Sequence, residues 1–89
     1  MTEDQAIKAI AVMLLLKPAM EQHIHPLLNG LGPDVQSAAV ADLAATYLAG
    51  CAPSQRPLMR QMLIELIDQL VAPNEKLLFG DKGHPATWN

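Results

Sequence analysis

Apolar residues recur along much of the chain at the three- and four-residue spacing of a helix with one apolar face. The clearest case runs from about Gln55 to Val71, and we expect Pro73 to end it because proline disrupts a helix interior. The stripe predicted to face inward comprises Met59, Met62, Leu63, Leu66 and Leu70, and the wet side comprises Gln61, Glu65, Asp68 and Gln69.

A first helix is predicted from about Glu3 to Leu16, because Thr2 and Gln5 have the spacing of a capping box. From Ala9 to Leu16 every residue is apolar, so this part of the helix has no polar side. A helix of that kind is normally buried all round. A buried β-strand over the same run is the alternative, although its Met, Leu and Ala content favours a helix.

Another helix is predicted from Pro33 to about Ala49, ended by Gly50 in the left-handed conformation that closes many helices. One face carries larger apolar residues. The opposite face comprises Val35, Ala38, Asp42, Ala45, Thr46 and Ala49, and its alanines allow another backbone to approach closely. The larger face comprises Val40, Leu43, Ala44, Tyr47, Leu48 and Cys51. After this helix, Ser54 is the predicted N-cap of the next one, with Pro57 in its first turn.

The segment from Pro18 to Asn29 carries conflicting signals, because Pro18 either bends the first helix or opens a second. Pro26 should disturb any helix there, since the residue before a proline avoids the α conformation. A single broken helix and a loop both remain open. Near the end of the chain, the triplet at residues 77–79 is expected to dock on the bundle.

The predicted fold is all-α: a small antiparallel bundle of three to four helices over residues 1–79, with a short irregular tail at 80–89. The chain of 89 residues has room for one domain and is 51% hydrophobic, with one Phe, one Tyr and one Trp. Its core must therefore come from aliphatic side chains, Met and Ala. Charged residues are 17%, which leaves the surface short of solvating groups.

These helices carry more apolar surface than one small bundle can cover, and large exposed apolar patches usually mark interfaces. We therefore expect a homodimer, most simply with two-fold symmetry. The predicted contact residues are Ile64, Ile67 and Val71, which form a flank beside the inward stripe. Trp88 is either disordered or an anchor that inserts into a neighbouring chain.

The net charge of −3 and the scattered Lys and Arg residues disfavour nucleic-acid binding, which depends on clustered cations. A dimer that gathers Arg56 and Arg60 into one patch is the exception. The single Cys51 fits a reducing compartment, and the first residues lack the basic start of a secretory signal. No apolar run approaches the ~20 residues of a membrane span. We expect a cytoplasmic protein without membrane contact.

The candidate ligands for a metal are Glu21, His23 and His25, with His84 and Cys51 further along. On a helix, residues two apart diverge by about 200°, so His23 and His25 cannot face one metal ion unless the segment is extended. We therefore interpret them as surface histidines. Cys51 follows a helix C-terminus, whose negative end disfavours a thiolate, and it is interpreted as a structural thiol.

No pair of acids and no nucleophile with a recognisable base stands out, so the sequence predicts no enzyme, no cofactor and no metal site. The predicted function is a non-enzymatic helical module for protein–protein interaction or regulation that associates with itself. Two alternatives remain. One is a dimeric DNA-associated regulator that uses Arg56 and Arg60, and the other is a metal or small-ligand carrier built on His23 and His25.

Overall fold

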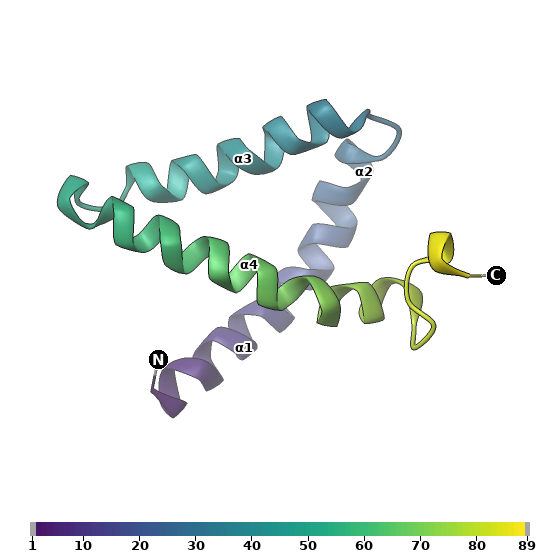
Figure 1. Ribbon diagram of the computed structural model, residues 1–89, viewed down its shortest axis with the longest axis horizontal. Helices are drawn as coiled ribbons and strands as arrows, with labels where there is room; N and C mark the ends of the chain where they lie inside the picture. The colour runs from purple at the N-terminus through teal and green to yellow at the C-terminus, as the bar shows by residue number, and fades with distance from the viewer. Residues whose placement is uncertain (1, 89) are drawn as a thin grey trace. The chain divides into compact units, whose positions relative to one another are not determined.

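The computed structural model describes residues 2–88, and within them every regular element is helical, without β-strands (Figure 1). The three long helices are α1 (Glu3–Ala19), α3 (Pro33–Ala49) and α4 (Arg56–Phe79). Shorter elements are a π-helical turn (Met20–Ile24), α2 (His25–Leu28) and 3₁₀ turns at Pro53–Gln55 and Pro85–Thr87. The all-α prediction is confirmed, and the antiparallel bundle stays a prediction.

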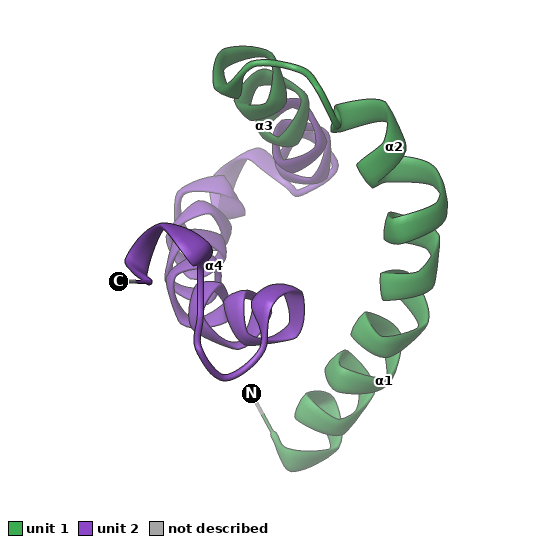
Figure 2. Ribbon diagram, turned by 90° about the vertical axis from the view of Figure 1, so that its right-hand side faces the viewer, with its two compact units in different colours: residues 1–41 green, residues 42–89 purple. Residues whose placement is uncertain are grey.

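The chain divides into two compact units, residues 1–41 and 42–89, which Figure 2 shows in two colours. Unit 1 holds α1, the π turn, α2 and the first part of α3. Unit 2 holds the end of α3, α4 and the C-terminal turn. The predicted boundary between residues 79 and 80 lies inside unit 2 and stays a prediction.

The capping box predicted at the start of α1 is confirmed. The hydroxyl of Thr2 accepts a hydrogen bond from the Gln5 backbone N–H at 3.2 Å, and the Gln5 side chain accepts one from the Thr2 N–H at 2.9 Å. The run 9–16 is helical throughout, so the strand alternative is wrong. The helix continues to Ala19 and takes in Pro18.

The segment between the prolines is one broken helix rather than a loop. At Met20–Ile24 the helix widens into a π turn, in which the His25 N–H reaches the Met20 carbonyl five residues back. Pro26 then lies in the first turn of α2. Gln36 of α3 donates from its side-chain amide to the Leu28 carbonyl at 2.9 Å and ties the end of α2 to the next helix.

The end of α3 differs from the prediction in its geometry. The helix stops at Ala49 as expected, but the positive-φ glycines within residues 2–88 are Gly30, Gly80 and Gly83, so Gly50 is not left-handed. The Gly50 N–H donates to the carbonyls of Thr46 and Tyr47 at 3.2 and 3.1 Å. A left-handed cap is not needed here because a side chain from the next helix binds the terminal carbonyls, as described below.

The start of α4 also differs. Ser54 lies inside the 3₁₀ turn Pro53–Gln55, so the prediction that it caps α4 is wrong. The N-cap is Gln55, which has no side-chain capping bond in the described structure. The 3₁₀ turn leads the chain directly into α4, so Ser54 already has helical geometry and cannot act as a cap. Pro57 lies in the first turn as predicted.

Pro73 does not end α4, which runs on to Phe79. Proline at this position removes the N–H that would pair with the Gln69 carbonyl. The backbone nevertheless stays helical on both sides of Pro73. The Asn74 side chain donates to the Leu70 carbonyl at 2.8 Å. The triplet 77–79 is therefore the last turn of α4, and Leu77 and Leu78 are exposed rather than docked.

Candidate interaction surface

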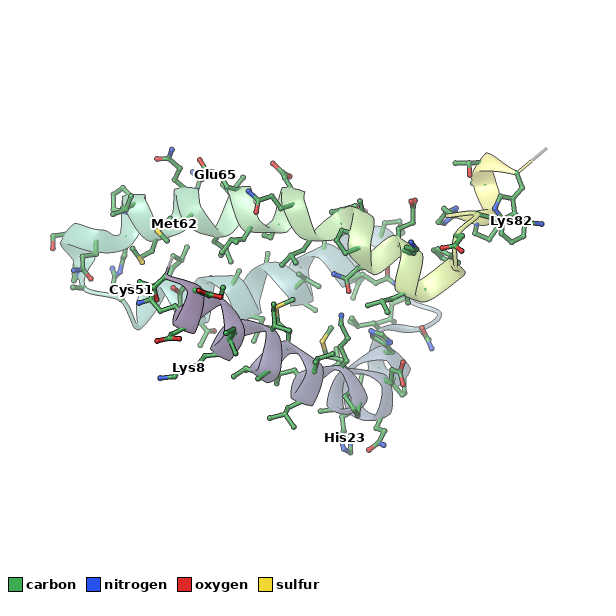
Figure 3. The ribbon with its side chains drawn as sticks, turned by 90° about the horizontal axis from the view of Figure 1, so that it is seen from below. Lys8, His23, Cys51, Met62, Glu65 and Lys82 are labelled. Carbon is green, nitrogen blue, oxygen red and sulfur yellow. The ribbon has the colours of Figure 1, made fainter. Side chains whose placement is uncertain are left out.

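Among residues 2–88 no side chain is buried, and this holds for the apolar as well as the polar residues. On α4, the half-buried side chains are Met59, Leu63, Leu70 and Asn74, and the first three belong to the stripe predicted to face inward. Figure 3 shows Met62 and Glu65 projecting from different sides of α4, as the predicted division into an apolar and a wet side requires. The amphipathic pattern predicted for α4 is therefore present.

The predicted contact residues on α4 are all exposed. Ile64 is 42% exposed, Ile67 49% and Val71 60%. Their spacing of three and four residues places them along one side of the helix. We call these three residues the α4 flank.

Unit 1 exposes an even larger apolar surface on α1 and α2. Leu15 is 78% exposed and Leu27 is 76% exposed. The other large apolar side chains exposed on α1 are Ile7, Ile10, Val12, Leu14 and Leu16. Many exposed leucines suggest an interaction surface, because single exposed leucines are ordinary but several along one element are not.

Arg56, one of the two arginines considered for nucleic-acid binding, is held by backbone carbonyls at the end of α3. Its Nε donates to the carbonyls of Leu48 and Cys51 at 3.1 and 3.2 Å, and its Nη2 donates to that of Ala49 at 2.9 Å. A cation at this place also interacts favourably with the negative end of the α3 dipole. Arg56 is therefore the C-terminal cap of α3.

Trp88 is 51% exposed and belongs to the C-terminal turn rather than to the α4 flank. Its indole Nε1 donates to the Lys82 carbonyl at 3.1 Å, and its backbone N–H donates to the Pro85 carbonyl. Figures 1 and 3 place this turn beyond the C-terminal end of α4. The four predicted contact residues thus lie in two separate parts of unit 2, the α4 flank and the C-terminal turn.

The candidate metal ligands do not converge in the described structure. His23 lies in the π turn and His25 begins α2, and within residues 2–88 no group of three or more His, Cys, Asp or Glu side chains could hold a metal ion. Figure 3 shows His23 projecting from its turn. Cys51 is half-buried, and its thiol donates to the Tyr47 carbonyl at 3.6 Å.

Sequence reasoning missed two of these features. Nothing in the spacing of Arg56 identified it as a cap, although an arginine a few residues beyond a helix end is a usable signal. The exposed leucines of α1 were expected to be buried, because an all-apolar helix normally is.

Comparison with protein families, with curated proteins and with solved structures found no match to this chain. Among the described residues, no helix combines the length and the apolar character that crossing a bilayer requires.

Proposed function

We propose that the chain is a non-enzymatic helical interaction module that associates with a second copy of itself. The apolar helix faces that are exposed in one chain would then pack against those of the other chain. The observation that supports this most directly is the absence of any buried side chain among residues 2–88. Folding loses chain entropy that only burial and dispersion can offset. A helix-forming chain without a core therefore needs a partner surface.

The DNA-associated alternative loses support from the contacts of Arg56. Its guanidinium already donates three hydrogen bonds to carbonyls, so phosphate binding would compete with the cap of α3. The module is proposed as cytoplasmic, which its single cysteine favours. These points leave self-association as the function that the residues support best.

Sedimentation equilibrium at tens of micromolar chain concentration tests the proposal. We expect twice the 9.6 kDa mass of one chain. The substitution Ile67→Glu places a charge in the α4 flank and should raise the dissociation constant roughly 30-fold, or about 2 kcal/mol, because a charge in an apolar contact is costly.

Gln69→Glu is the matched control, since it adds the same charge on the wet side of the same helix and should leave the mass unchanged. A single-chain mass for the unsubstituted protein would refute self-association. Equal weakening by both substitutions would show that charge, and not the α4 flank, determines the association.

A further inference from the structure

The residues after α4 form a turn with its own hydrogen bonds, which we call the C-terminal latch (residues 80–88). Gly80, with a φ of 80°, turns the chain at the end of α4. The rings of Phe79 and His84 then meet edge to face with their centroids 4.7 Å apart. Lys76 on α4 pairs with Asp81 at 3.2 Å, and the Trp88 indole closes the structure on the Lys82 carbonyl.

His84 occupies a special place in this latch because its side chain acts as a hydrogen-bond acceptor. Its Nδ1 accepts the Ala86 backbone N–H at 3.0 Å and so caps the 3₁₀ turn Pro85–Thr87. The His84 carbonyl accepts both the backbone N–H and the hydroxyl of Thr87, at 2.9 and 2.8 Å. An imidazole nitrogen accepts a hydrogen bond only while it carries no proton.

We infer that the C-terminal latch is a proton-operated closure, in which neutral His84 holds residues 80–88 closed and its protonation opens them and frees the Trp88 side chain. A proton on Nδ1 would set two N–H donors against each other, so the capping bond is lost. The latch is therefore closed at higher pH and opens as the pH falls. This inference does not depend on self-association.

The other charged groups around the latch are few. From α4 they are Lys76, and Glu75, whose carboxylate lies beside Gly83; from the turn they are Asp81 and Lys82. Histidine is the side-chain type that ordinarily exchanges its proton between pH 5 and 8. His84 is the only histidine in residues 42–89.

Nuclear magnetic resonance gives a direct test, because Trp88 is the only tryptophan and contributes one indole N–H resonance. Between pH 8 and 5 we expect this resonance to move along a one-proton curve while the proximity signal between the Phe79 and His84 rings fades. Loss of a capping bond should lower the ratio of closed to open latch roughly five-fold.

Two substitutions make the test specific. His84→Asn keeps a capping oxygen that takes no proton, so its latch should stay closed at both pH values. His84→Ala should have the lowered ratio of closed to open latch at both. The control His25→Asn should titrate as the unsubstituted protein does. An indole resonance that does not move with pH would overturn the inference. So would a His84→Asn protein that still titrates or is open throughout.

Discussion

Arg56 shows how one side chain can replace a backbone device. The carbonyls at the end of a helix lack intrahelical partners, and a left-handed glycine usually helps to satisfy them. Here three of the carbonyls around Gly50 receive the Arg56 guanidinium instead. The connection between α3 and α4 thus depends on Arg56, which lies eight positions after Leu48, the first residue whose carbonyl it binds.

Arg56→Ala should therefore lower the stability of unit 2 by about 1 kcal/mol, a modest value because the guanidinium is exposed to water. For a protein of this size the Tm should fall by about 4–8 °C, measured by circular dichroism at a fixed chain concentration. Arg60→Ala is the matched control, one turn further along α4, and should change the Tm much less. If the two variants melt alike, Arg56 is not a cap.

At the scale of the element, prolines determine where the helices deviate from regular geometry. Pro18 and Pro73 lie inside α1 and α4, and each deprives the carbonyl four residues earlier of its usual donor. Pro57 lies in the first turn of α4, where the same residue type costs almost nothing, and Pro26 directly follows the π turn. The effect of each proline thus follows from its position in the helix.

Pro73→Ala should stabilise α4 by about 1–3 kcal/mol, because it restores the hydrogen bond to the Gln69 carbonyl and removes the contact of the ring with it. Helicity at 222 nm and the Tm should both rise. Pro57→Ala, in the first turn of the same helix, should change stability by no more than about 0.5 kcal/mol. A Pro73→Ala protein that is no more stable than the unsubstituted one would contradict this account.

Local signals in the sequence predicted the helices better than their ends. Thr2 with Gln5 gave the start of α1, and the spacing of apolar residues gave the apolar stripe of α4, because both depend on neighbours within one turn. The continuation of α4 through Pro73 was missed because a proline lowers helix stability without forbidding it. The cap by Arg56 and the bond from Trp88 to Lys82 were missed because they join residues several positions apart through the fold of a turn.

At the scale of the whole molecule, the surface prediction and the fold prediction are linked. The α4 flank is exposed as expected, but so are the leucines of α1, which the sequence predicted to be buried. Apolar periodicity shows which side of a helix avoids water, and it does not show whether the covering surface comes from the same chain. That is why the bundle stays a prediction and self-association a proposal.

If folding and association are coupled, the Tm must rise with chain concentration, because binding to the folded state stabilises it by mass action. Over a hundredfold range of concentration we expect an increase of several degrees in thermal unfolding followed at 222 nm. Ile67→Glu should melt lower at every concentration. A Tm independent of concentration, with a sharp transition, would describe a chain that is stable alone.

The π turn at Met20–Ile24 has a consequence for the direction in which α2 faces. A wide turn holds one residue more than an α-helical turn, so it changes the angular phase of all later side chains by roughly 100°. In a continuous α-helix, the angle of Leu27 around the helix axis would follow from its position after α1. The extra residue of the π turn changes that angle. Leu27 is therefore turned by about a quarter of the helix circumference from the direction that it would have without the π turn.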